Sequence, residues 1–256
     1  MKRFRIEKIN DKGRGEEETF IIAERPVTLY LNDQEVVTLL VTPQNLKELA
    51  VGFMLSEGWL KENKPIDTIE VDPQGEVRVR VKYRNPLTEK LFLRRTITSG
   101  CGRGTIFYNV LDSLGAKKIR SSTRISQKQV LHLMQELSRG SVLYRQSGSV
   151  HGAALAERHR ILFLCEDIGR HNAVDKVLGA AFLQGLFPAG KILLISGRAS
   201  SEIVVKAIKR RIPFLFSYSG PTDLAVDMAR QMGITLIGYV RGNRMRVYSH
   251  GERVKP

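Results

Sequence analysis

The sequence predicts an α/β protein in which a small α+β module precedes a larger α/β domain. Two observations support this prediction. The first hundred residues contain short apolar runs separated by turn residues, with one helical run among them. From about residue 125, helical stripes alternate with short apolar runs, which is typical of a largely parallel sheet with helices on both faces. We therefore predict one domain over residues 1–120 and a second over residues 121–256.

The N-terminal module is expected to contain two hairpins and one helix. Asn32 and Asp33 lie between two apolar runs and indicate a tight turn. Thr42 followed by Pro43 is typical of a capping residue and the first residue of a helix, and Gly58 is expected to end that helix. The strands are expected at residues 27–31, 36–40, 69–71 and 77–81.

The second domain is expected to begin with a helix that ends near Gly140 and to continue with an antiparallel strand pair. Asn172 and Asp175 have the spacing of a capping box, so a further helix is expected to open at Asn172. Helices are then expected at residues 202–209 and 221–232, and the strands at residues 153–156, 161–165, 192–195, 214–216 and 234–240.

Composition excludes several classes of protein. Of the 256 residues, 42% are hydrophobic and 26% are charged, which suits one large or two modest cores and leaves little room for disorder away from the termini. The apolar stretch over residues 177–190 is shorter than the roughly 20 residues that a bilayer requires. The N-terminus lacks the apolar run of a signal peptide. We expect a cytoplasmic protein with no membrane partner.

The chain is strongly basic. Its 41 lysines and arginines against 26 acidic residues give a net charge of +15, and such a field attracts nucleotide phosphates, nucleic acids or an acidic protein partner. A basic surface with no such role is the alternative. An RNA-binding module is disfavoured and no specific nucleic acid is expected, because aromatic residues make up only 7% and form no base-stacking motif.

The two cysteines lie in different surroundings. Cys165 ends an apolar run and is predicted to be a core residue. Cys101 is flanked by glycines and lies near Arg94, Arg95 and Arg103. Arginines and a following helix start favour the thiolate, which is the nucleophilic form, although free cysteines are more often small buried hydrophobes. Because such a loop does not suit a buried residue, we predict that Cys101 is reactive.

Three loops before predicted helices combine glycine with groups that bind anions. They cover residues 166–172, 196–202 and 217–222, and in open α/β sheets ligands bind at helix N-termini beyond the carboxyl ends of the strands. Arg170 and Arg198 suit bidentate contacts with phosphate, with His171 and Ser200 beside them. The alternative is that polar residues cap helices and glycines permit turns. The three loops together favour a nucleotide-like ligand.

Two neighbouring features allow more than one interpretation. Glu166 and Asp167 either do acid–base chemistry with His171 or form a hydrogen-bond network that supports the loop, and we favour the network. Neither GxGxxG nor GxxxxGK[ST] occurs, so ordinary dinucleotide or P-loop binding is not supported. Near the C-terminus, Gly242-Asn243 indicates a hairpin turn flanked by arginines, which is either an anion-binding element or a charged, solvated edge.

The motifs taken together resemble the FdhD family of formate dehydrogenase accessory sulfurtransferases. The resemblance runs from the hairpin at residue 27 to Tyr248, and its most specific segment is EDIGRHNAVDK at residues 166–176. The other matching segments, in the family's order, are TPQNLKELAVGFMLSEG (42–58), SGRASSE (196–202), SGPTDLAV (219–226) and GYVRGNRMRVY (238–248).

This resemblance implies a fold and a function. The second domain would be a cytidine-deaminase-like three-layer domain with a mixed sheet, in a homodimer. Cys101 would take sulfur as a persulfide from a cysteine desulfurase and pass it to the molybdenum bis-guanine-dinucleotide cofactor before that cofactor enters formate dehydrogenase. The cofactor would be bound by the hairpin residues Tyr239, Val240, Arg241, Gly242, Asn243 and Arg244, together with Arg170, His171, Arg198 and Ser200 of the loops.

One departure from the family pattern keeps an alternative open. The family usually carries a CxxC pair in this loop, but the second position here is Gly104. Either Cys101 works alone, or the protein is a cofactor-binding chaperone that does not transfer sulfur. A zinc deaminase is excluded, because it requires P-C-x-x-C where residues 196–200 contain no cysteine. No metal site is predicted.

Overall fold

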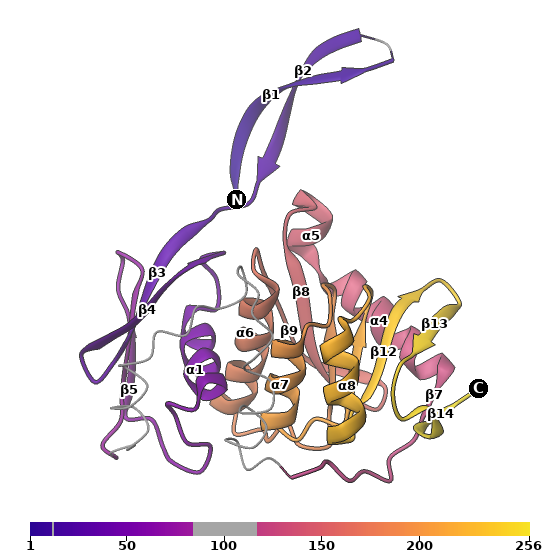
Figure 1. The fold of residues 1–256 in the computed structure, drawn as a ribbon. Helices are drawn as coiled ribbons and strands as arrows, with labels where there is room; N and C mark the ends of the chain where they lie inside the picture. The colour runs from indigo at the N-terminus through magenta and orange to yellow at the C-terminus, as the bar shows by residue number, and fades with distance from the viewer. Residues whose placement is uncertain (12, 84–116) are drawn as a thin grey trace.

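The computed structural model describes residues 1–11, 13–83 and 117–256. Cys101 and Gly104 lie outside the described residues. The described chain has a mixed α/β fold with more than one sheet (Figure 1). The boundary between residues 120 and 121 stays a prediction, as does the likeness of the second domain to a cytidine deaminase.

A six-stranded mixed sheet forms the centre of the described C-terminal part, in the order β13-β12-β11-β10-β8-β9. Its middle strands β10, β11 and β12 are parallel, whereas β8, β9 and β13 are added by antiparallel pairing. The prediction of a largely parallel sheet is therefore wrong, and the mixed sheet that the family resemblance implies is confirmed. Tight turns join β8 to β9 and β12 to β13, which permits only antiparallel pairing, and β8 also pairs antiparallel with β10. The strands are β8 (His151–Glu157), β9 (Arg160–Asp167), β10 (Ile192–Ile195), β11 (Phe214–Ser217), β12 (Thr235–Arg241) and β13 (Arg244–Val247).

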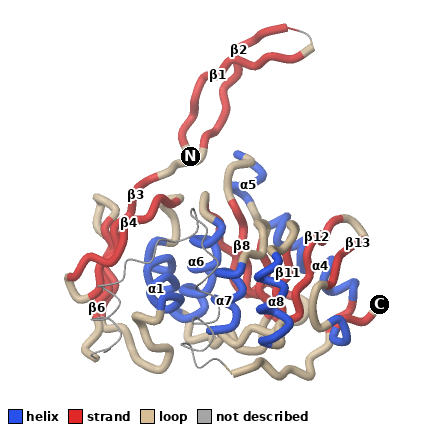
Figure 2. The backbone as a smooth tube through the Cα atoms, viewed as in Figure 1, coloured by secondary structure: helices blue, strands red, loops and turns tan. Residues whose placement is uncertain are grey.

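Helices cover both faces of this sheet, as Figure 2 shows. Three helices, α6 (Arg170–Leu183), α7 (Ser201–Lys209) and α8 (Asp223–Met232), pack on one face, and α4 (Gln127–Gly140) packs on the other. Alternate residues of β10 point to opposite faces: Leu193 enters the core beneath α6–α8, and Leu194 enters the core beneath α4. Short, wholly apolar strands are the sequence signature of a sheet buried on both faces.

A second, four-stranded sheet lies in the N-terminal module, in the order β4-β3-β6-β5. Its strands are β3 (Arg25–Leu31), β4 (Gln34–Val41), β5 (Thr68–Val71) and β6 (Glu76–Arg80), and the helix beside it is α1 (Leu46–Glu57). Both predicted hairpins are confirmed. The positive φ angles of Asn32 (49°) and Asp33 (65°) match the twist of a two-residue hairpin turn. Gly58 ends α1 as predicted.

The predicted start of α1 is wrong. The helix begins at Leu46, and the capping position is Asn45 instead of Thr42. The hydroxyl of Thr42 accepts a hydrogen bond from the backbone N–H of Ile168, 3.2 Å away. The Thr42 hydroxyl therefore bonds a residue far away in the sequence and does not cap α1.

Helix α1 joins the two sheets by packing directly on α6 (Figure 1). The two backbones approach at Gly52 and Gly179. A Cβ atom on Gly52 would lie 1.8 Å from the carbonyl oxygen of Asp175, and one on Gly179 would lie 1.9 Å from that of Glu48. Glycine is required at both positions because neither backbone can withdraw.

An N-terminal hairpin projects away from the rest of the molecule (Figure 1). Its strands are β1 (Lys2–Asn10) and β2 (Gly13–Ile21), paired antiparallel along their length. The sequence analysis did not predict these strands, although charged and apolar residues alternate at Phe4, Arg5 and Ile6, a pattern typical of a strand. Phe4, Ile6 and Phe20 are exposed on the hairpin.

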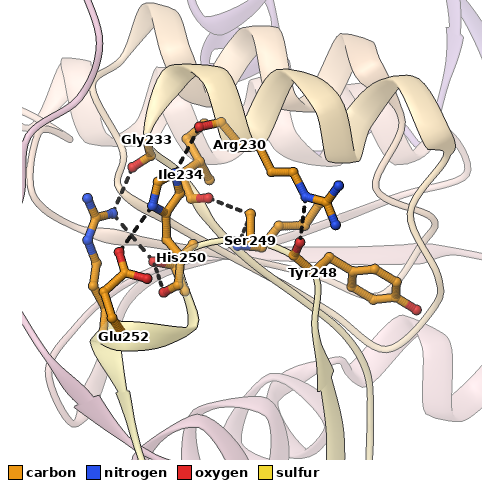
Figure 3. Close-up of polar contacts among 10 residues, drawn as sticks. Arg230, Gly233, Ile234, Tyr248, Ser249, His250 and Glu252 are labelled. Atoms are coloured by element: carbon orange, nitrogen blue, oxygen red, sulfur yellow. Dashed lines mark hydrogen bonds and ion pairs between the residues drawn. The ribbon is translucent and has the colours of Figure 1, made fainter.

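Hydrogen bonds connect the C-terminal segment to the end of α8 and to the residue before β12 (Figure 3). The Ser249 hydroxyl donates to the carbonyl of Ile234 (2.7 Å), and His250 Nε2 donates to the carbonyl of Arg230 (3.0 Å). The carbonyl of Arg230, in the last turn of α8, is one that a helix end leaves unsatisfied. The remaining short elements are β7 (Ile125–Ser126), α5 (Val142–Ser147), the 3₁₀ turn η1 (Gly251–Arg253) and β14 (Val254–Lys255). No helix in the described ranges is long and apolar enough to cross a membrane.

Substituting Gly52 by alanine tests the close helix contact. The added methyl group overlaps the backbone of α6, so we expect Gly52→Ala to lower the free energy of unfolding by about 3 kcal/mol. Gly15→Ala is the matched control, since nothing lies within 4 Å of its Cβ position, and its change should stay within about 0.5 kcal/mol. Urea denaturation followed by circular dichroism measures both values. Equal effects would contradict the close contact.

Candidate functional site

The loop after β9 begins with Glu166, which holds a neighbouring helix. Its carboxylate oxygens accept hydrogen bonds from the backbone N–H groups of Leu143 and Tyr144, each at 2.8 Å. These are the first residues of α5, where N–H groups have no partner within the helix. Glu166 therefore supports structure, as the sequence analysis favoured.

Asp167 forms a fully buried ion pair with Lys176. The carboxylate oxygen lies 2.6 Å from Lys176 Nζ, and both side chains are 0% exposed. Asp167 also accepts bonds from the N–H groups of Thr42 (3.1 Å) and Gly169 (2.8 Å) and from the amide of Asn172 (3.0 Å). Lys176 in turn donates to the carbonyls of Thr42 and Glu166. The pair thus joins the end of β4 to the loop and to α6.

The predicted capping box at Asn172 is wrong. Helix α6 begins at Arg170 with Gly169 at the capping position. The amide of Asn172 instead donates to Asp167 and to the carbonyl of Leu40 in β4. Its partner in the predicted box, Asp175, accepts from the hydroxyl of Ser56 in α1 (2.7 Å) and pairs with Lys206 of α7. Both residues connect different elements.

The three predicted loops meet at one edge of the sheet, beyond the carboxyl ends of its parallel strands. The Ser217 hydroxyl donates to the carbonyl of Gly197 (2.7 Å), and Ala199 forms a β-bridge with Pro221. A Cβ atom on Gly197 would lie 3.2 Å from Arg170 Cβ and 3.2 Å from His151 Nδ1. The backbone of the second loop is therefore enclosed by the first loop, the third loop and β8.

Two polar atoms at this edge are buried without a hydrogen-bond partner among the described residues: Arg170 Nε and Ser200 Oγ. Ser200 occupies the capping position of α7, but its side chain makes no capping bond. Thr222, at the same position of α8, does cap its helix. The simple capping explanation therefore holds for Thr222 and fails for Ser200. Buried polar atoms without partners are rare and suit a site that binds a ligand.

His171 and Arg198 occupy different settings at this edge. His171 Nε2 lies 3.2 Å from the carboxylate of Glu202. Burial, with Lys206 nearby, lowers the pKa of His171 to about 4, so the imidazole beside Glu202 is neutral near pH 7. Arg198 is exposed.

His151, which the sequence analysis did not select, lies 3.4 Å from the Ser196 hydroxyl, and burial beside Arg170 lowers its pKa. Only the pairing of β8 with β10 brings it here.

The predicted hairpin is confirmed as β12 and β13, and its six proposed cofactor residues divide between two sides. Val240, Arg241 and Gly242 line a pocket of ≈ 220 Å³ with Tyr218 and one side of α4.

Tyr239 faces the third loop, where its ring would collide with any side chain on Gly220, and Arg246 lies 4.8 Å from the ring centre. Arg244 and Asn243 are exposed at the turn. The loop containing Tyr218 and Gly220 thus links the pocket to the loop edge.

Cys165 is confirmed as a core residue. It is 5% exposed and packs in the core under α6–α8, and burial raises the pKa of its thiol to about 12. A thiol of this kind stays protonated near neutral pH and is a poor nucleophile.

These features define an α/β protein with buried polar atoms at the loop edge and an adjoining pocket lined by the hairpin and α4. The model of the FdhD/NarQ family matches residues 22–255, and the chain belongs to this family. It is 39% identical over 236 residues to the sulfur carrier protein FdhD of Bacillus subtilis, covering 92% of this chain and 90% of the relative. The FdhD of Listeria innocua is 38% identical over 240 residues, with 93% and 92% covered.

A solved structure shows the same fold. It is described as a formate dehydrogenase accessory protein from Desulfotalea psychrophila, with a TM-score of 0.79, 28% sequence identity and 98% of each chain covered. The sulfur carrier function predicted from the sequence agrees with the names of the relatives. The residue assignments of the cofactor site stay predictions.

Replacing Lys176 tests the buried ion pair. In Lys176→Met the Asp167 carboxylate stays buried without its cation, so we expect the free energy of unfolding to fall by about 3 kcal/mol. Lys191→Met is the control: Lys191 pairs with Glu157, whose side chain is 41% exposed, and we expect a loss below about 1 kcal/mol. Urea denaturation of both variants measures the difference. If the free energy of unfolding falls as little in Lys176→Met as in Lys191→Met, the buried ion pair does not stabilise the fold as proposed.

Proposed function

We propose that this protein is a sulfur carrier for formate dehydrogenase that transfers sulfur, as a persulfide on Cys101, to the molybdenum bis-guanine-dinucleotide cofactor. The family and the names of the relatives support the sulfur carrier role. The persulfide and the cofactor are what the resemblance to the family implies, and the reactive surroundings of Cys101 in the sequence and the arginine-bearing loops agree with them. The observation that carries the cofactor part is the arginine-bearing pocket beside an edge with unpaired buried polar atoms.

The sulfur chemistry points to Cys101 by comparison with the other thiol. The chain has two cysteines, and Cys165 is buried with a pKa raised to about 12. The Cys101 thiolate attacks the outer sulfur of a desulfurase persulfide, an S–S bond forms on Cys101, and the desulfurase cysteine leaves as a thiolate. In the second step the bond between Cys101 and the outer sulfur breaks and the Cys101 thiolate is restored. Delivery of that sulfur at the sulfide level would consume two electrons, which a thiol reductant would supply.

The cofactor is the cargo of this reaction, and the residues present fit its nucleotide portion. Phosphate groups are bound by guanidinium groups and by backbone N–H groups at helix starts. Arg241 and Arg244 supply guanidinium groups at the hairpin, and Arg170 and Arg198 supply them at the loops. Ser200, whose hydroxyl has no partner among the described residues, adds a neutral donor at the start of α7. The chain's contribution is to bind and orient the cargo.

The partners follow from the resemblance to the family. A cysteine desulfurase would donate the sulfur, a formate dehydrogenase would receive the finished cofactor, and the carrier would act in the cytoplasm as a homodimer with a cytidine-deaminase-like second domain. Gly104 in place of the usual second cysteine favours one alternative, a chaperone that binds the cofactor and does not transfer sulfur.

Intact-mass spectrometry tests the persulfide. After incubation with a cysteine desulfurase and cysteine, we expect the protein to gain one sulfur atom that a reductant removes. Cys101→Ala should lose this gain, because it removes the nucleophile, and should still fold.

Cys165→Ala is the matched control and should retain the gain, since Cys165 is a core thiol. Absence of any gain on Cys101, with guanine-nucleotide binding retained, would contradict the transfer function and support the chaperone.

Nucleotide titration tests the hairpin. We expect Arg241→Ala combined with Arg244→Ala to weaken GDP binding at least about tenfold, because each charge-assisted bond contributes roughly 1.5–3 kcal/mol. Arg158→Ala combined with Arg160→Ala is the control, since these exposed arginines occupy the β8–β9 turn at the opposite edge of the sheet. Isothermal titration calorimetry measures the affinities. Equal affinities in the two double variants would remove the hairpin from the site.

A further inference from the structure

Helix α4 supplies one whole side of the pocket at the hairpin. Leu131, Met134, Gln135, Ser138 and Arg139 line it. Their spacing of three and four residues places them on a single stripe of the helix. This stripe lies beside the buried stripe that packs on the sheet, so α4 both covers the core and forms a pocket wall. None of these five residues belongs to the predicted cofactor set.

The pocket has an apolar floor and a charged rim. Met134 and Val240 are each 1% exposed, and Leu131 is half-buried. Gln135 and Arg139 are exposed at the opening. Ligand sites in proteins combine an apolar lining with a few polar groups that orient the ligand. An apolar floor suits a planar base, and a charged rim suits a phosphate.

Two arginines line this pocket from different elements, Arg139 from α4 and Arg241 from the hairpin. Arg241 is oriented by a bond from its Nε to the carbonyl of Tyr218 (3.3 Å). Arg139 contacts Glu136 at 3.1 Å, and these side chains are 72% and 39% exposed. Exposed ion pairs contribute little free energy, so an anionic ligand can replace Glu136 as the partner of Arg139.

The size of the pocket restricts the ligand. Its ≈ 220 Å³ lies below the roughly 300–1,000 Å³ that encloses a drug-sized molecule. A pocket of this size has room for a base, with the phosphates at its charged rim, and the remainder of a dinucleotide must extend along the surface. The loop that carries Tyr218 leads from the pocket to the edge with Arg170 and Ser200.

We propose that Arg139 of α4 binds a phosphate of the guanine nucleotide together with Arg241, while the base lies on the floor formed by Leu131 and Met134. This inference rests on the proposed function and adds a specificity-determining residue from outside the hairpin. Arginine binds phosphate through charge-assisted and often bidentate hydrogen bonds, so a second arginine from another element adds affinity and restricts the orientation of the phosphate further.

Calorimetric titration with GDP and with guanosine tests this assignment. We expect Arg139→Ala to weaken GDP binding about tenfold and to leave guanosine binding unchanged, because guanosine has no phosphate. Arg145→Ala is the matched control: this exposed arginine lies on α5 and does not line the pocket, so both affinities should match those of the unaltered protein.

The outcomes separate this inference from the proposed function. Wild-type affinity for GDP in Arg139→Ala overturns the role of Arg139 and leaves the cofactor proposal intact. An equal loss for GDP and guanosine also overturns it, since the effect then does not depend on phosphate. If the unaltered protein binds neither GDP nor guanosine, the cofactor part of the proposed function fails, and the role of Arg139 fails with it.

Discussion

The buried ion pair between Asp167 and Lys176 is the interaction on which the arrangement of the two sheets depends. Both side chains are fully enclosed, so the desolvation of two charges is offset only if every remaining polar atom has a partner. Thr42 supplies a donor to one member and an acceptor to the other. The end of β4 is thereby held against the loop that follows β9. Because the pair becomes costly when any contact is lost, it favours one placement of the N-terminal module.

The need to satisfy buried charges explains why segment 166–176 contains so many charged residues. In the sequence alone, these residues are also consistent with acid–base chemistry. Glu166 accepts a hydrogen bond from the backbone at the start of α5, and Asp167 forms an ion pair with Lys176. Asp175 connects α1 to α7 through Ser56 and Lys206. Arg170 is left with a buried Nε that has no partner among the described residues. The hydrogen bonds and ion pairs of the neighbouring residues position Arg170 at the edge where the three loops meet.

The parallel strands β10, β11 and β12 provide the geometry for a ligand. Their carboxyl ends lie side by side, and the loops that follow them touch through Ala199 and Pro221. Arg241, the last residue of β12, lines the pocket opposite α4, and antiparallel β13 follows it. The pocket and the loop edge are therefore connected through the third loop, which is the arrangement on which the proposed binding of a nucleotide-bearing cofactor depends.

Local patterns in the sequence determined the elements and much of the site. Apolar runs marked the strands, Asn32-Asp33 and Gly242-Asn243 marked turns, and the apolar surroundings of Cys165 marked a core thiol, because each depends on residues adjacent in the chain. The three loops were predictable for the same reason, since helix starts follow strand ends. Tertiary structure alone decided that Thr42 and Asn172 bond distant segments instead of capping helices, that His151 joins the loop edge, and that α4 forms a pocket wall. Those outcomes depend on sheet register and helix packing between residues far apart in the chain, which no local pattern encodes.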